Sequence, residues 1–335
     1  WKFFQRHSID DLTRQSDYWL GLQGRLTQPL MLRPGSRFYE PLEWNEAFAR
    51  IGGALKRLDS PNEAIFYTSG RTSNEAAFLY QLFVRAFGTN NLPDCSNMCH
   101  ESSGVAVGIG KGSVTLDDVH EADTIIVMGQ NPGTNHPRML TALQKAKKNG
   151  AQIIAINPLP EAGLMGFINP KTPGQVLSGG TQIADLFLQV QINGDVALLK
   201  ALMCLLLEAE AREPGKVLDD EFIGLHTDGF HELRAHLESQ DVDGLIDVAG
   251  ITRGELEQAV ESVLRSRKTI VCWAMGLTQH RNGVGNVREI VNFLLMRGSI
   301  GMPGAGTCPV RGHSNVQGDR TMGIHDRPKQ ALLDR

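Results

Sequence analysis

The sequence lacks the features that mark membrane, secreted and nucleic-acid-binding proteins. Its 335 residues contain no apolar run of about 18 residues, and they open on a polar segment of mixed charge rather than on a basic stretch followed by an apolar one. We therefore expect no membrane span, no secretory leader and a cytoplasmic protein. An excess of one charge is also lacking: the formal net charge of −4 argues against broad binding to nucleic acid, which relies on a basic excess.

Cysteine is scarce, and its number is odd. Five cysteines spread over the chain fit reduced thiols better than a disulfide framework. With 41% hydrophobic and 21% charged residues, the composition is that of a globular protein long enough for two or more lobes, each with its own core. The sequence begins at Trp1 rather than at a methionine, so we expect it to be part of a longer protein.

Short aliphatic runs followed by helical periodicity predict β-then-α units. Two buried strands joined by a crossover helix imply a parallel sheet covered by helices, with ligands beyond the carboxyl ends of the strands. Asp195 and Thr252 are the expected N-caps of two helices. The expected strands are 64–68, 123–128, 151–156 and 269–273, and the expected helices are 74–87, 137–149, 195–210, 252–265 and 285–297.

A first group of residues that could carry chemistry lies between Cys95 and Gly104. Cys99 is followed directly by His100, just before a glycine-rich stretch that can open a helix. A thiolate beside an imidazole and helix-terminal N–H groups suits a metal ligand or a nucleophile. The alternative, a buried free cysteine next to a hydrogen-bonded histidine, stays open at this point. A structural zinc site is disfavoured because CxxxC has no second pair of ligands at suitable spacing.

The segment 298–318 is a second candidate, because it is long, rich in glycine and without periodicity. Arg311 is followed by Gly312, so the backbone can approach a ligand closely while the guanidinium offers a two-pronged donor to a carboxylate or phosphate. Apolar residues frame the segment, which favours an ordered binding loop over a polar surface loop. We expect no regular structure within it.

Polar residues also cluster where the predicted strands end. Asn131, Asn135 and His136 follow one strand, Asn157 follows the next, and residues 275–280 follow the third. Their repeated position at one sheet edge predicts a single cleft for a nucleotide-like ligand. An ordinary dinucleotide site at the glycines of 108–112 is disfavoured, because the Rossmann spacing is absent and no strand directly precedes them.

At this point the sequence resembles the molybdopterin oxidoreductases, and within them formate dehydrogenase alpha subunits and the similar YdeP-type branch. The resemblance runs from about Gly24 to about Pro328. Several long motifs in the right order are more specific than any single pattern. They are TSGRTSNEAAFLYQLF (68–83), GTNNLPDCSNMCHESS (88–103), GQNPGTNHPRML (129–140), MGLTQH (275–280), NFLLMRGSIGMPGAG (292–306) and CPVRGHSNVQGDR (308–320).

The resemblance assigns roles to individual residues. Cys99 stands where the family binds molybdenum through cysteine or selenocysteine, His100 at the neighbouring histidine, and Arg311 at the arginine of the formate pocket. A second set of positions matches or neighbours those that hold the pterin nucleotides. This cofactor-binding set is Arg71, Asn74, Asn131, Asn135, Asn157, Met275, Gly276, Gln279, Gly312 and Asn315.

The function implied is a molybdenum-dependent, formate-dehydrogenase-like oxidoreductase. The expected cofactors are molybdenum or tungsten with two molybdopterin guanine dinucleotides, and a 4Fe-4S cluster from a preceding part of the protein. Formate or a similar small substrate would be oxidised to carbon dioxide, and an electron-transfer partner subunit would receive the electrons. A nitrate-reductase-like enzyme, which shares the cysteine, and a scaffold subunit without the metal are the alternatives. The pair His100 and Arg311 argues for formate over nitrate, and retention of Cys99 together with that pair argues against a scaffold.

Two further expectations come from the resemblance. Where formate dehydrogenases carry Asp-Pro-Arg, this chain has Asn157-Pro158-Leu159, which favours the YdeP-type branch. The iron–sulfur module and the C-terminal domain of the family are not visible, so this segment alone is expected to be inactive. The predicted fold class is α/β with two lobes of parallel or mixed sheets covered by helices. We expect a connecting segment at 1–37, a discontinuous first lobe at 38–94 plus 312–335, and a Rossmann-like lobe at 95–311.

Overall fold

The computed structural model describes residues 1–93, 95–108, 111–169 and 179–328. The glycine stretch 108–112 falls partly outside these residues. The described chain separates into two compact units, one of residues 1–67, 75–93 and 322–328, the other of 68–74 and 95–321. The lobe limits predicted from the sequence stay predictions.

The described residues of the larger unit form a sheet of five parallel strands in the order β5-β4-β3-β6-β7. This order reverses between β3 and β6, as in a Rossmann sheet, and the predicted α/β fold class is confirmed. The predicted strands at 123–128, 151–156 and 269–273 are confirmed within a residue. The strands are β3 (Thr124–Met128), β4 (Gln152–Ile156), β5 (Leu186–Leu188), β6 (Thr269–Trp273) and β7 (Gly306–Pro309).

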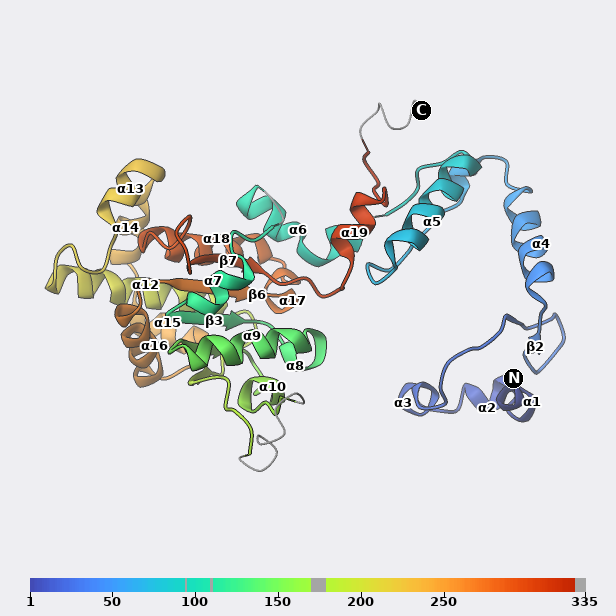
Figure 1. Ribbon diagram of the computed structural model, residues 1–335, viewed down its shortest axis with the longest axis horizontal. Helices are drawn as coiled ribbons and strands as arrows, with labels where there is room; N and C mark the ends of the chain where they lie inside the picture. The colour runs from blue at the N-terminus through green and yellow to red at the C-terminus, as the bar shows by residue number, and fades with distance from the viewer. Residues whose placement is uncertain (94, 109–110, 170–178, 329–335) are drawn as a thin grey trace. The chain divides into compact units, whose positions relative to one another are not determined.

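Both faces of the sheet are covered, which explains why its strands are continuous apolar runs. Successive side chains of a strand point to opposite faces. In β3, Ile126 and Met128 therefore enter the core beneath α12, α16 and α18, whereas Ile125 and Val127 enter the core beneath α9. Figure 1 shows α18 and α9 on opposite sides of the strands. These helices are α9 (Pro137–Lys148), α12 (Asp195–Arg212), α16 (Arg253–Arg265) and α18 (Gly283–Met296).

The helix starts test the predicted caps. Thr252 is confirmed as the N-cap of α16: its side chain accepts from the backbone N–H of Glu255, and Glu255 bonds back in a capping box. The prediction for Asp195 is wrong. Gly194 is the N-cap of α12, and Asp195 is the first residue of the helix and is buried. A carboxylate in a first turn is favoured by the helix dipole, so the sequence signal was the same at either position.

The glycine-rich segment contains more structure than predicted. Gly306–Pro309 forms β7, the edge strand beside β6, and α19 begins at Val316. Because β7 pairs with one neighbour and is short, it lacks the apolar run that identifies a central strand. The other described helices of this unit are α6 (Cys95–Val107), α7 (Leu116–Glu121), α8 (Pro132–Asn135), α10 (Ala162–Met165), α13 (Asp220–His226), α14 (Phe230–Glu238), α15 (Val242–Ala249), α17 (Met275–Thr278) and α19 (Val316–Thr321). No described helix is both long and apolar enough to cross a membrane.

The smaller unit has its core on α5, whose predicted span is confirmed. The predicted strand at 64–68 is wrong: the segment joins a neighbour by one backbone bond, from Phe66 to Asn91, and no described strand pairs with it. The Phe66 ring packs instead on Tyr80 and Phe87 of α5. The elements are α1 (Lys2–Arg6), α2 (Ile9–Leu12), α3 (Asp17–Gly21), β1 (Leu30–Met31), β2 (Glu40–Pro41), α4 (Trp44–Leu55), the 3-10 helix η1 (Pro61–Glu63) and α5 (Asn74–Phe87).

Two glycines meet where the strand order reverses. Gly129 follows β3 with φ of +56°, and the backbone N–H of Gly276, after β6, donates to its carbonyl at 3.0 Å. A Cβ on Gly276 would lie 2.5 Å from Cα of Gly129, and a Cβ on Gly129 would lie 2.9 Å from Cα of Gly276. The two backbones approach so closely that neither position can carry a side chain without displacing the other.

We expect Gly129→Ala to lower the free energy of unfolding by roughly 2 to 4 kcal/mol, because it combines a left-handed φ with a backbone clash. Gly215 is the matched control, since it has φ of +76° and nothing within 4 Å of an added Cβ. Gly215→Ala should cost about 1 kcal/mol, the conformational strain alone. Chemical denaturation of the purified variants measures both values. Equal losses would mean that the contact contributes little.

Candidate functional site

The loops after the carboxyl ends of the strands surround a cavity of about 390 Å³, a size typical of small-molecule sites. We call it the carboxyl-edge cavity. Residues from the loops after β3, β4, β5 and β6 line it, together with the segment after β7. Its described lining is Arg71, Gly129, Gln130, Asn131, Asn135, His136, Asn157, Pro158, Glu161, Val190, Gln191, Ile192, Asn193, Asp195, Ala274, Met275, Gly276, His280, Gly312 and His313.

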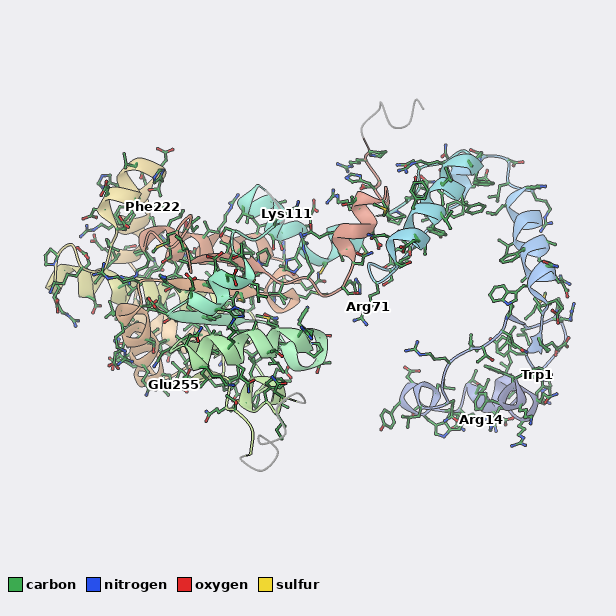
Figure 2. All side chains as sticks on the ribbon, viewed as in Figure 1. Trp1, Arg14, Arg71, Lys111, Phe222 and Glu255 are labelled. Carbon is green, nitrogen blue, oxygen red and sulfur yellow. The ribbon has the colours of Figure 1, made fainter. Side chains whose placement is uncertain are left out.

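The structure brings together seven of the residues predicted to hold a cofactor: this cavity is lined by Arg71, Asn131, Asn135, Asn157, Met275, Gly276 and Gly312. Arg71 projects from the loop that precedes α5 (Figure 2). Asn74, Gln279 and Asn315 are not among the described lining residues. Asn315 Nδ2 donates to the Thr72 carbonyl at 2.7 Å and to Asn74 Oδ1 at 2.8 Å, so this pair fastens the loop 68–74 to the start of α19. Their role as ligands stays a prediction.

Cys99 is buried on α6, at a kink where His100 leaves helical geometry with φ of −139°. Its carbonyl, released by the kink, accepts from Thr278 Oγ1 at 2.7 Å. Gly312 leaves open the space beside it: a Cβ at Gly312 would lie 3.8 Å from Cys99 Sγ and 3.1 Å from Met275 Sδ. The two sulfur atoms therefore face one small space that a larger residue than glycine would fill.

His100 has both ring nitrogens engaged. Nε2 donates to the Val310 carbonyl at 2.9 Å, so Nδ1 must accept from the Ser103 hydroxyl at 3.0 Å, which in turn accepts from Trp273 Nε1 at 3.0 Å. Burial, assisted by the charge of Arg311, lowers the pKa of His100 to about 4. The ring is thus neutral at physiological pH, in one tautomer, and held by a complete chain of bonds.

Arg311 lines a second cavity of about 410 Å³, which we call the arginine cavity. It adjoins the first, because Arg71, Asn135, His136 and Gly312 line both. Its described lining contains three arginines and no carboxylate, and it includes the first turn of α9, whose dipole also favours an anion. The lining is Arg71, Thr134, Asn135, His136, Pro137, Arg138, Met139, Arg311, Gly312 and Ser314.

The strand-end asparagines are fixed by bonds to each other's loops. Asn131 caps α8 by accepting from the backbone N–H of Thr134, and its Nδ2 donates to Glu161 at 2.6 Å. Asn157 Nδ2 donates to the Gln130 carbonyl at 3.1 Å. The loops after β3 and β4 are therefore tied side by side before any ligand is present.

Sequence reasoning missed several residues of the cavity wall. Asp195 was read only as a cap, and Gln191 and Asn193 were not recognised because β5 was not predicted. Asn193 has φ of +69°, the sole positive φ among the described non-glycine residues. The signal was available: Asn193-Gly194 is a turn pair between an alternating strand pattern and a helix.

The metal and pterin nucleotide implied by the resemblance fit these surroundings. Gln130 Oε1, in the cavity wall, is buried with no hydrogen-bond partner in the described part of the chain, so it is available to a ligand donor. The space beside Gly312 is open to a group bonded to Cys99 Sγ. No three His, Cys, Asp or Glu side chains of the described residues converge as a metal site. A metal at Cys99 would take its other ligands from the cofactor.

Comparison with known proteins agrees with this chemistry. A family model described as molybdopterin oxidoreductase matches residues 25–326. Protein YdeP of Escherichia coli is 48% identical over 342 residues, covering 99% of this chain and 45% of its own length. Formate dehydrogenase H of the same organism is 30% identical over 311 residues, covering 90% of this chain and 40% of its own.

Two further comparisons concern coverage and fold. Uncharacterized oxidoreductase Rv2900c of Mycobacterium tuberculosis is 56% identical over 341 residues, which is 100% of this chain but 44% of the relative. The chain thus spans less than half the length of these relatives. The solved structure of acetylene hydratase from Pelobacter acetylenicus matches 97% of this chain and 42% of its own, with a TM-score of 0.64 at 17% identity, which is a likeness of fold.

Asp195 should make stability depend on pH. Burial raises the pKa of its carboxyl to about 6 from 3.8, although its own backbone N–H and His280 act to lower it. The folded state then binds more protons than the unfolded state between these values, so this residue's contribution to stability falls as pH rises from about 4 to about 6. The full loss is roughly 3 kcal/mol, because one unit of pKa shift corresponds to about 1.36 kcal/mol.

We expect Asp195→Asn to remove this dependence, so the variant should gain stability relative to the parent as pH rises through that window. Denaturant unfolding at several pH values between 4 and 8 measures the difference. Asp220→Asn, on the exposed first turn of α13, is the control and should track the parent. Parallel curves for the parent and the Asp195 variant would contradict the assignment.

Proposed function

Because the chain belongs to the molybdopterin oxidoreductase family, we propose that its two adjoining cavities hold a pterin guanine nucleotide, with Cys99 as the protein ligand to molybdenum or tungsten. The observation that carries the proposal is the meeting of both cavities at Gly312, beside the buried Cys99 thiol. A cavity with acceptor groups, a cationic cavity and a soft sulfur ligand thus adjoin one another, which suits a cofactor with a base, a diphosphate and a metal-binding end.

The chemistry of each cavity supports a particular part of the nucleotide. A guanine base presents N–H donors, and the carboxyl-edge cavity offers Asp195, Glu161 and the unpartnered Gln130 Oε1 as acceptors. A diphosphate needs cations and N–H groups, and the arginine cavity offers the guanidinium groups of Arg71 and Arg138 and the first turn of α9. The base would therefore lie toward β5 and the diphosphate toward Arg138.

Arg311 is the group best suited to a small carboxylate substrate. Its planar guanidinium can take both oxygens of formate, and its loop runs directly into Gly312 beside Cys99. When bound, the metal centre would accept the two electrons released as formate becomes carbon dioxide and a proton. The chain's part is to orient the carboxylate, to exclude water and to receive the proton.

The proposal keeps His100 as a catalytic residue, with one restriction on its role as a proton acceptor. In the bond pattern seen here its Nδ1 accepts from Ser103 and its Nε2 donates to Val310. It could accept a proton at Nδ1 only after the Ser103 hydroxyl turns away. Catalysis by His100 therefore requires a local rearrangement, whereas its structural role requires none.

Other parts of the proposal concern the full length of the relatives, of which this chain spans less than half. A second pterin guanine dinucleotide, a 4Fe-4S cluster and an electron-transfer partner would lie outside the described residues. The relatives support this extension, since two of them are named as formate dehydrogenases and each is longer than the matched segment.

The assignment of Cys99 is tested with Cys95, four residues earlier on α6. In the full-length protein, Cys99→Ser should abolish turnover because the hard hydroxyl replaces the soft sulfur ligand. Cys95→Ser should keep metal content and turnover, because Cys95 Sγ is buried against His313 and Gly70. Its distance to His313 Nδ1 is 3.8 Å. Elemental analysis and formate-dependent dye reduction measure both properties. Equal loss in the two variants would sink the assignment.

The role of Arg311 is tested by Arg311→Lys, which keeps the charge and loses the two-pronged donor. We expect kcat/KM for formate to fall by a factor that corresponds to about 2 to 4 kcal/mol, typical of a desolvated contact to the reacting group. Arg288→Lys, on an exposed part of α18, is the control. If the lysine variant matches the parent, Arg311 serves another ligand; if the parent reduces nitrate and leaves formate unchanged, the substrate is wrong.

A further inference from the structure

Two histidines from different parts of the chain bind two consecutive carbonyls of the active-site loop. His100 Nε2 donates to the carbonyl of Val310 at 2.9 Å, and His136 Nε2 donates to the carbonyl of Arg311. A carbonyl oxygen can only accept, so each imidazole must carry its proton on Nε2. The donors thus bind the peptide units on either side of the Cα of Arg311, the residue whose guanidinium lines the arginine cavity.

Each imidazole is itself held by a donor at its second nitrogen. Ser103 and Trp273 fix His100 through a chain of 3.0 Å bonds. Gln130 Nε2 lies 3.4 Å from Nδ1 of His136, and the Gln130 backbone is bound to Asn157. Ser103 and Gln130 therefore support the direction of the two rings from the side away from the loop, while the loop carbonyls define the tautomer.

The two supports come from opposite faces of the sheet. His100 is on α6, which packs against α18, whereas His136 is the N-cap of α9 on the other face. Between them, the Val310 N–H donates to the Trp273 carbonyl at 2.8 Å, the last pairing of β7 with β6. Beyond Val310 the loop leaves the sheet, so the sheet itself no longer fixes the backbone of Arg311.

The geometry points to a histidine clamp, formed by His100 and His136, that positions Arg311 for its anion. Both are positioning residues: they act on the backbone of Arg311 and not on the substrate. The sequence placed His136 only among the polar residues at the strand ends, so a positioning role is new for it, and for His100 the role differs from acid–base catalysis. It rests on the proposed function only for the identity of the anion that Arg311 binds.

The physical reason for a clamp at this point is the glycine that follows. Gly312 must be free of a side chain to leave space beside Cys99, and a glycine also gives the backbone its widest conformational freedom. An arginine next to such a residue would sample many directions. Two N–H donors on the preceding carbonyls restrict it without adding a side chain to the cavity.

The experiment replaces the donor while keeping the volume. In the full-length protein, His136→Leu removes the N–H, and His136→Gln keeps an N–H at the same reach. Hydrogen–deuterium exchange of the peptide covering residues 306–316 reports the backbone directly. Loss of one such bond should speed its exchange about tenfold in the leucine variant, while the glutamine variant stays close to the parent. His100→Leu should likewise speed the exchange of this peptide, and His100→Gln should stay close to the parent. His231→Leu, on an exposed part of α14, should leave the exchange of this peptide unchanged.

A second readout connects the clamp to Arg311. With formate as the probe, KM should rise about tenfold or more in the leucine variants and recover in the glutamine variants, because the anion site is misdirected rather than removed. Exchange in 306–316 that is unchanged by His136→Leu, or that is equally fast in the glutamine variant, would overturn the clamp. Faster exchange rescued by glutamine, in a protein that does not use formate, would support the clamp and refute the proposed substrate.

Discussion

The contact between Gly129 and Gly276 is the constraint on which the site depends. The strand order reverses between β3 and β6, and the carboxyl ends of these two strands meet there backbone against backbone. Because neither residue carries a side chain, the loops that follow diverge from a common point, and the carboxyl-edge cavity opens between them. The loops are also joined by side-chain bonds of Asn131 and Asn157, so the cavity has its shape in the protein alone. Such preorganisation reduces the entropy lost when a ligand binds.

The central part of the fold could be predicted because its strands are buried on both faces. A strand such as β3 then reads as an unbroken apolar run, and its neighbours follow after one amphipathic helix. The prediction failed where that signal is absent. β7 is an edge strand that contains a glycine and a proline, β5 is three residues long, and α6 is too polar and too rich in small residues to show a helical stripe. The segment 64–68 has the composition of a strand, but its phenylalanine packs on a helix.

The location of the site was more predictable than the hydrogen bonds within it. Strand-end asparagines had to gather at one edge, since parallel strands end together. Which of them face the cavity depends on bonds that no spacing reveals: Asn315 and Asn74 bind each other, and His100 and His136 bind the loop of Arg311. The sequence identified Asp195 as a helix-start residue but did not predict its burial, because that burial depends on where β5 ends.

The order of the strands also decides when the protein can first build its site. β3 and β6 are neighbours in the sheet, yet residues 129–268 separate them along the chain. At typical rates of synthesis the ribosome needs roughly 7 to 28 s to make that stretch. Throughout this interval β3 has an unpaired edge, and α18, which completes the core on one of its faces, has not been made. Unpaired strand edges and exposed apolar surface of this kind favour aggregation and chaperone binding. Cofactor loading must therefore follow a late, non-local step of folding, and it cannot assist the early ones.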